Sequence, residues 1–136
     1  MQTDERQIRA VYDKKTITVY QAYNKIIAES AVKNQTFVSP PFKMDRMTWI
    51  KPSFLWMMYR SGWGTKPNQE HMLAIKISRE GFEWALQNAC LSHFDPDVHE
   101  SEKAWKEQLQ NSPVRIQWDP ERDIHMNKLD YRAIQI

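Results

Sequence analysis

A pair of carboxylates near the end of a predicted strand is the first candidate for chemistry. Residues 117–122 have the sequence QWDPER, and Pro120 is expected to end the strand there. Carboxylates at the exit of a strand are well placed for acid, base or electrostatic catalysis. The alternative is a turn held by an ion pair between Asp119 and Arg122, because ion pairs with purely structural roles are common. The predicted catalytic residues are Gln117, Asp119 and Glu121.

A second stretch combines aromatic and basic side chains in residues 46–64, RMTWIKPSFLWMMYRSGWG. Lys51 and Arg60 could bind phosphate, and Trp63, between two glycines, could stack on a base. Arg60 follows Trp56 by four residues, so it could also lie over that ring on a helix. The alternative is a core helix with aromatic side chains at its edge, because large aromatics mostly serve packing.

The charge distribution gives a reason to look for an anionic ligand. The net charge is +2, but residues 43–79 carry seven basic and two acidic side chains. Such asymmetry favours an anionic ligand for the middle of the chain, although a solvated surface of mixed charge would look similar. Residues 93–99, HFDPDVH, contain suitable metal ligands, but their spacing matches no established motif, so no metal site is predicted.

Length and composition limit the class of protein. A chain of 136 residues with 41% hydrophobic residues fits one globular domain. Three glycines leave little room for a glycine-rich phosphate loop, and one cysteine cannot form an internal disulfide. The sequence shows neither an apolar run long enough to span a membrane nor a signal peptide. We therefore expect a cytoplasmic protein without a membrane partner, and we leave its oligomeric state open.

The elements that would position these residues follow from hydrophobic periodicity and turn residues. Their mixed order predicts a single α+β domain with a small mixed sheet and three to four helices. The strand at 71–78 has a mostly apolar body and is expected to be central. The expected strands are 7–12, 46–50, 71–78, 114–119 and 131–136, and the expected helices are 19–35, 53–60, 79–91 and 100–110.

Several of these segments together resemble a known family. They are IRAVYDKKTITVYQAY, then RMTWIKPSFLWMMYRSGWGTKPNQEHMLAIKISREGFEWAL, then VRIQWDPER and YRAIQI. The chain resembles the family called domain of unknown function 4291 over nearly its whole length. The resemblance implies no activity that can be transferred. Because members of that family look longer, the resemblance implies that residues 1–136 lack a C-terminal segment.

The sequence has an arginine on the first predicted strand, a helix after it, a serine in the aromatic segment and a late carboxylate. In these features it loosely resembles ADP-ribosyltransferases, which use NAD. The resemblance implies that Arg9 on the first strand holds the NAD phosphates, while Ser53 and Trp63 shape the nicotinamide pocket. Glu121 would then stabilise the cationic ribose of the transition state. The final strand carries Gln135, which cannot supply a negative charge.

These observations predict an enzyme acting on a nucleotide or nucleic acid, with ADP-ribosyl transfer from NAD as one specific form. The ligand-binding candidates are Arg9, Lys51, Ser53, Arg60 and Trp63. One alternative is a non-catalytic module that binds nucleic acid or protein through the same basic and aromatic surface. Another is an inactive, shortened homologue.

Overall fold

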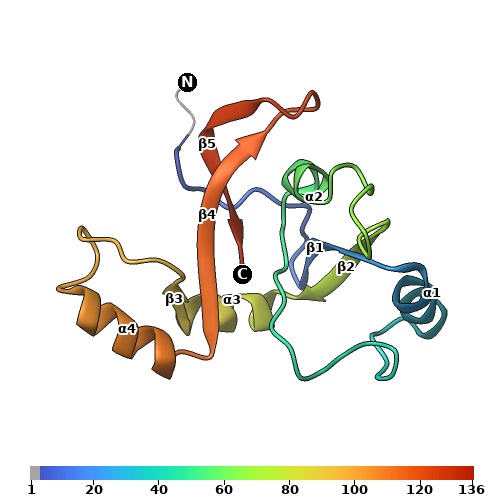
Figure 1. The fold of residues 1–136 in the computed structure, drawn as a ribbon, viewed down its shortest axis with the longest axis horizontal. Helices are drawn as coiled ribbons and strands as arrows, with labels where there is room; N and C mark the ends of the chain where they lie inside the picture. The colour runs from blue at the N-terminus through green and yellow to red at the C-terminus, as the bar shows by residue number, and fades with distance from the viewer. Residues whose placement is uncertain (1–3) are drawn as a thin grey trace.

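Two long antiparallel strands form the centre of one half of the molecule (Figure 1). The computed structural model describes residues 4–136. β1 (Thr16–Tyr23) pairs with β2 (His71–Ser78) along its whole length. The prediction of a helix from residue 19 was therefore wrong for its first part, because β-branched residues at 16–19 favour a strand. The helix α1 (Lys25–Asn34) begins after Asn24, whose side chain accepts the Ile27 N–H.

The other half contains a three-stranded mixed sheet. β3 (Ala89–Leu91) is parallel to β4 (Val114–Arg122), and β4 is antiparallel to β5 (Lys128–Gln135). The sequence predicted that Pro120 would end this strand, but β4 continues past it. The strand continues through a register shift between Pro120 and Arg122, and such a bulge tolerates the missing proline N–H. Glu121 lies at this bulge.

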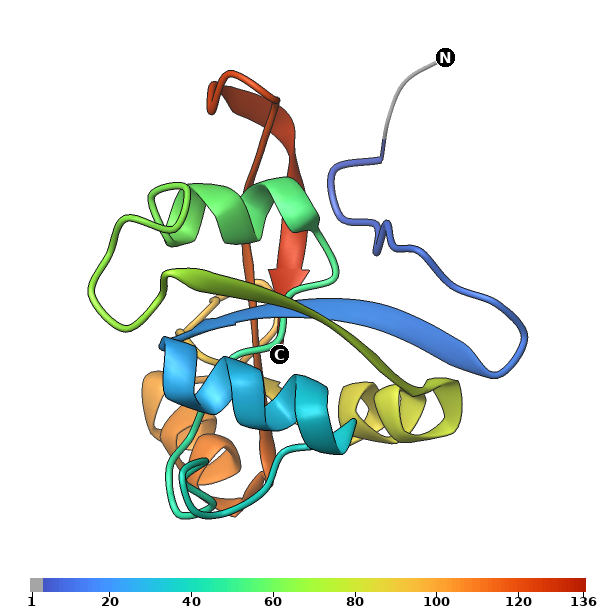
Figure 2. The ribbon, with the colours of Figure 1, turned by 90° about the vertical axis from the view of Figure 1, so that its right-hand side faces the viewer.

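The remaining helices begin within two residues of the predicted positions. They are α2 (Phe54–Arg60), α3 (Arg79–Gln87) and α4 (Glu102–Asn111), and each has a serine N-cap. α3 is shorter than predicted, because residues 89–91 form β3 instead of its last turn. Figure 2 shows α2 on one side of the β1–β2 pair and α1 and α3 on the other.

Two predicted strands do not form. Residues 7–12 contribute only an isolated bridge from Tyr12, although Ile8 and Ala10 pack against the core. Residues 46–50 contain no strand either, but Ile50 and the following Lys51 link the two sheets. Ile50 exchanges both backbone hydrogen bonds with Ile136, at N–O distances of 2.8 and 3.0 Å, and Lys51 pairs with Tyr20.

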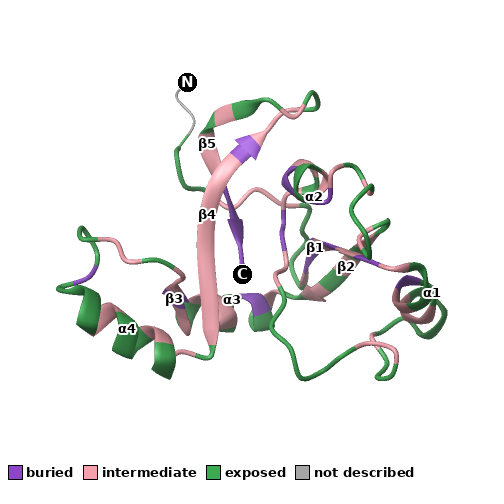
Figure 3. Ribbon diagram, in the orientation of Figure 1, coloured by how far each residue is buried: buried purple, intermediate pink, exposed green. Residues whose placement is uncertain are grey.

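The core lies where the two sheets meet. Its buried residues come from β1, α3 and the end of the chain, as the purple segments of Figure 3 indicate. β2 was predicted to be central, but it is paired on one side only and several of its side chains are exposed. The described chain is an α+β domain with four helices and two small sheets. None of the described helices has the length and hydropathy needed to cross a membrane. The core residues are Ile17, Val19, Phe82, Ile134 and Ile136.

Candidate functional site

Two adjoining cavities of about 420 and 220 Å³ lie beside β1 and the loop before α2. The larger one also reaches α2, and the smaller one reaches the start of α1. They share the side chains of Tyr23, Arg46, Thr48 and Asn68, so we treat them as one basic cleft. None of the described residues that line the cleft is acidic. A concave surface lined by charge of one sign concentrates ions of the opposite sign. The cations that line the basic cleft are Lys43, Arg46, Lys51 and Arg60.

Lys51 is the buried cation of the cleft. Its backbone is fixed by two hydrogen bonds to Tyr20, with N–O distances of 2.8 and 3.3 Å. The residue is 4% exposed, and no ion pair within residues 4–136 includes it. The pKa of Lys51 is lowered to about 8, mainly by burial and further by the nearby Arg60, while Asp119 opposes the shift.

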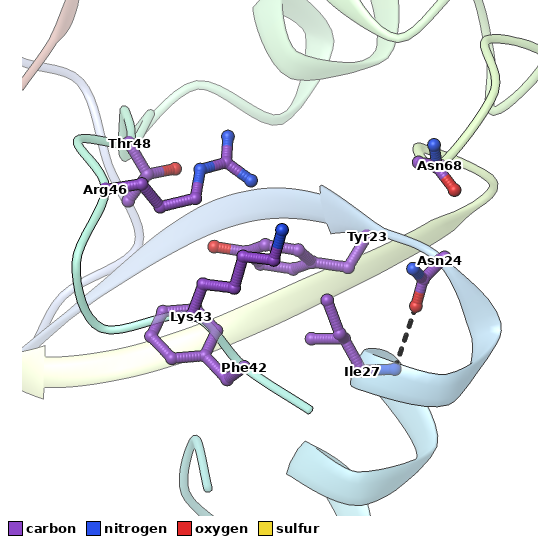
Figure 4. Close-up of a pocket in the computed structure, with 8 residues that line it drawn as sticks. All are labelled: Tyr23, Asn24, Ile27, Phe42, Lys43, Arg46, Thr48 and Asn68. Carbon is purple, nitrogen blue, oxygen red and sulfur yellow. Dashed lines mark hydrogen bonds between the residues drawn. The ribbon is translucent and has the colours of Figure 1, made fainter. Parts of the chain in front are cut away.

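Tyr23 lies where the two cavities meet. It is 7% exposed, and its hydroxyl has no hydrogen-bond partner among the described residues. The side chains of Thr48 and Gln21 are near the hydroxyl without completing a hydrogen bond, and burial raises the pKa of Tyr23. Figure 4 shows Lys43 and Arg46 extending toward the Tyr23 side chain from the loop before α2. A buried hydroxyl without a hydrogen-bond partner destabilises the fold unless a ligand or water supplies the missing hydrogen bond.

An amide–carboxylate network lies on one face of β4 and β5. Gln117 Nε2 donates to Asp119 Oδ1 at 2.8 Å, and Gln135 Nε2 donates to Asp119 Oδ2 at 2.9 Å. Because Ile50 pairs with Ile136, strand alternation places Lys51 on the same face as Gln135. The effect of Asp119 on the pKa of Lys51 agrees with this placement. The network therefore adjoins the basic cleft through Lys51.

The alternative ion pair between Asp119 and Arg122 does not form. The guanidinium carbon of Arg122 lies 3.8 Å from the centre of the Tyr59 ring, and Tyr59 stacks on Trp56. This stack also replaces the predicted contact between Arg60 and Trp56.

Ser53 and Glu121 meet at the start of α2. Ser53 Oγ donates to Glu121 Oε1 at 2.8 Å and accepts the Trp56 N–H at 3.1 Å. Glu121 is 8% exposed, and its carboxylate also accepts the Arg122 N–H at 2.9 Å. Neither Ser53 nor Glu121 lines the basic cleft. The structure thus brings together two predicted site residues, but in a contact that joins α2 to β4.

Arg9 and Trp63 do not line the cleft either. Arg9 has its guanidinium 4.4 Å from the centre of the Tyr131 ring and donates to the Asp4 carbonyl at 2.9 Å. Trp63 follows α2 in a left-handed turn with φ of 59°, and its side chain is 48% exposed. Of the five predicted ligand-binding residues, Lys51 and Arg60 line the cleft.

The described residues contain no group of three or more His, Cys, Asp or Glu side chains that could hold a metal ion. In the acidic loop before α4, the imidazole Nδ1 of His99 lies 3.1 Å from the backbone N of Asp95.

Sequence reasoning did not select the polar residues at which the two cavities meet, and it considered Gln135 only as a residue without the negative charge of a carboxylate. Tyr23 was assigned to a helix, where nothing suggested that its hydroxyl would be buried without a partner. The excess of basic residues in 43–79 was the signal for Arg46, but the sequence could not show which cations converge. The residues not selected are Tyr23, Thr48, Asn68 and Gln135.

The fold and the site define a small α+β domain with a positively charged cleft and a carboxylate network beside it. The chain belongs to the family described as domain of unknown function (DUF4291), whose model matches residues 7–136. Comparison with curated proteins and with solved structures gave no match.

Proposed function

We propose that this protein binds a phosphate-bearing nucleotide in the basic cleft and acts on it as an enzyme. The observation that supports this most is the convergence of four cations without an acidic lining residue. Lys51 adds weight, because it is buried without an anionic partner. An unpaired buried charge costs roughly several kcal/mol, and a bound phosphate would offset that cost.

The proposed roles follow from position in the cleft. Arg46 and Lys43 reach toward Tyr23 at one cavity, while Lys51 and Arg60 belong to the other. A ligand with two phosphates could therefore contact both pairs of cations, with the Tyr23 hydroxyl donating between them. Arginine binds phosphate through two parallel hydrogen bonds, which would fix the orientation of the ligand.

The catalytic step is proposed for the carboxylates beside the cleft. NAD has two phosphates and a glycosidic bond whose cleavage develops positive charge, so ADP-ribosyl transfer is one specific form of the proposal. Asp119 is the carboxylate whose charge reaches Lys51. Glu121, the carboxylate chosen from the sequence, would need to exchange its Ser53 hydrogen bond for a contact with the substrate.

A non-catalytic module that binds nucleic acid remains the second candidate, and one observation favours it. Three aromatic side chains are exposed on or just after α2: Phe54 at 45%, Tyr59 at 39% and Trp63 at 48%. Exposed rings beside cations are typical of proteins that bind single strands. Such binding should weaken steeply with salt and should not depend on a carboxylate.

Titration calorimetry with NAD, ADP, inorganic phosphate and a single-stranded RNA tests the proposal. Arg46→Met and Arg60→Met should each weaken ADP binding about tenfold or more, because a hydrogen bond to a charged group contributes about 1.5–3 kcal/mol. Lys103→Met is the matched control, since Lys103 lies on α4 and does not line the cleft. Equal effects of all three substitutions, or no ADP binding by the original protein, would refute nucleotide binding in the cleft.

Turnover is tested separately from binding. NAD consumption is measured for the original protein, for Asp119→Asn and for Glu121→Gln. An enzyme of the proposed kind loses turnover and keeps binding when its charged catalytic carboxylate becomes an amide. RNA binding that falls steeply with salt, with no turnover of any nucleotide, would favour the binding module instead.

A further inference from the structure

Lys51 differs from the other cations of the cleft in a way that phosphate binding alone does not require. Lys43, Arg46 and Arg60 are exposed, whereas Lys51 is 4% exposed on a backbone tied to β1. A solvated lysine would bind phosphate as well without the cost of burial. Burial instead raises the fraction of Lys51 that is a neutral amine, which is the nucleophilic form of a lysine.

We propose that Lys51 is a nucleophile that forms an imine with a phosphate-bearing aldehyde or ketone held in the basic cleft. This inference rests on the proposed binding of phosphate in the cleft. The exposed cations would hold the phosphate, and the buried amine would react with the carbonyl group. An open-chain sugar phosphate, including the ribose end of a nucleoside diphosphate sugar, is a ligand of this class.

The groups that face Lys51 determine how much neutral amine is present. Burial has the largest effect and disfavours the ammonium form of Lys51. Arg60 of α2 also disfavours it, whereas Asp119 of β4 favours it. With a pKa of about 8, roughly a tenth of the amine is neutral at pH 7, about 300-fold more than for an ordinary lysine. Part of this gain is lost, because a less basic amine is a weaker nucleophile.

The bond changes balance without an oxidant or reductant. The Nζ lone pair attacks the carbonyl carbon, and the C=O bond is replaced by a C=N bond. The carbonyl oxygen leaves as water with the two protons of the neutral amine. Arg60, which cannot lose its proton in a protein, can stabilise the developing oxyanion.

Pyridoxal 5′-phosphate is a suitable probe, because it carries an aldehyde and a phosphate on one small molecule. The protein is treated with it at pH 7.5, the imine is reduced with borohydride, and the modified peptides are quantified by mass spectrometry. Lys51 should be modified at least about tenfold faster than Lys103, given its larger neutral fraction. Pyridoxal, which lacks the phosphate, should modify Lys51 without this preference over Lys103. ADP should protect Lys51 from modification by pyridoxal 5′-phosphate.

Two further measurements separate this inference from the proposed function. Lys51→Arg removes the nucleophile, so modification at position 51 should be lost, while ADP binding is measured by calorimetry on the original protein. Modification of Lys51 no faster than Lys103 would overturn the inference, even if calorimetry shows ADP binding. Fast modification of Lys51 that neither phosphate on the probe nor ADP affects would also overturn it, because the carbonyl ligand would then not be held by the cleft.

Discussion

The contact between Ser53 and Glu121 allows a sharp test of whether Glu121 has a structural role. Ser53→Ala removes two interactions of one hydroxyl. The first is the N-cap of α2, in which Ser53 Oγ accepts the Trp56 N–H at 3.1 Å. The second is the hydrogen bond that the same oxygen donates to Glu121 Oε1 at 2.8 Å. Because Glu121 is 8% exposed, water does not readily replace the lost donor.

The expected cost is the sum of these two effects. Loss of a serine cap costs about 1 kcal/mol. A hydrogen bond to a charged group contributes about 1.5–3 kcal/mol, and most of it is lost when the carboxylate stays buried. Ser53→Ala should therefore lower the free energy of unfolding by about 3 kcal/mol. In a domain of this size that corresponds to a fall in Tm of roughly 10 °C.

Urea denaturation at pH 7 measures this cost, with Ser53→Thr as the matched control. Threonine keeps the hydroxyl and is a good cap, so it should cost less than about 1 kcal/mol. Glu121→Gln should be less costly in the Ser53→Ala background than in the original protein, with a coupling energy of about 1 kcal/mol. A cost of Ser53→Ala below about 1 kcal/mol, or no coupling, would refute the structural role and leave Glu121 free for chemistry.

Two further predictions concern the buried groups of the basic cleft. The unfolded chain keeps the Lys51 proton up to its ordinary pKa of 10.5, whereas the folded protein releases it near pH 8, so stability should rise with pH between these values. In urea denaturation the free energy of unfolding should rise by about 2 kcal/mol between pH 7 and 9.5. Lys51→Met should abolish this rise. An unchanged rise in that variant would mean that another group causes it. Tyr23→Phe removes a buried hydroxyl that has no partner, so it should change stability by less than about 1 kcal/mol and weaken ADP binding several-fold. Calorimetry and denaturation measure these two effects, and a large loss of stability with unchanged affinity would contradict the proposed ligand contact of Tyr23.

The starts of α2, α3 and α4 could be predicted to within two residues, because each depends on a few neighbouring residues. Ser53 and Ser78 precede apolar helical patterns, and each side chain caps its helix. The alternation of residues 7–12 was an equally local signal, but a strand also needs a partner edge, and only Tyr12 finds one within that segment. Pro120 looked like the end of a strand, yet the bulge at Glu121 lets β4 continue past it.

The site was only partly predictable, because its parts are joined by pairing between distant segments. The basic and aromatic character of residues 46–64 identified Lys51 and Arg60. The sequence could not show that Lys51 lies beside the network of Gln117, Asp119 and Gln135. That proximity depends on the hydrogen bonds between Ile50 and Ile136, which place the end of the chain against the segment before α2.

The pairing of β4 and β5 changes what Gln135 implies about ADP-ribosyl transfer. As an isolated residue, Gln135 argued against ADP-ribosyl transfer, because an amide cannot stabilise a cation. In the fold its amide donates to Asp119, which also accepts the Gln117 amide. A carboxylate therefore lies on the same face of the sheet, one strand away, with Lys51 beside it. When Lys51 is a neutral amine, it does not compensate the negative charge of Asp119. A cation formed in the ligand would then face an available negative charge, which makes Asp119 a stronger candidate than Glu121 for the charged catalytic group.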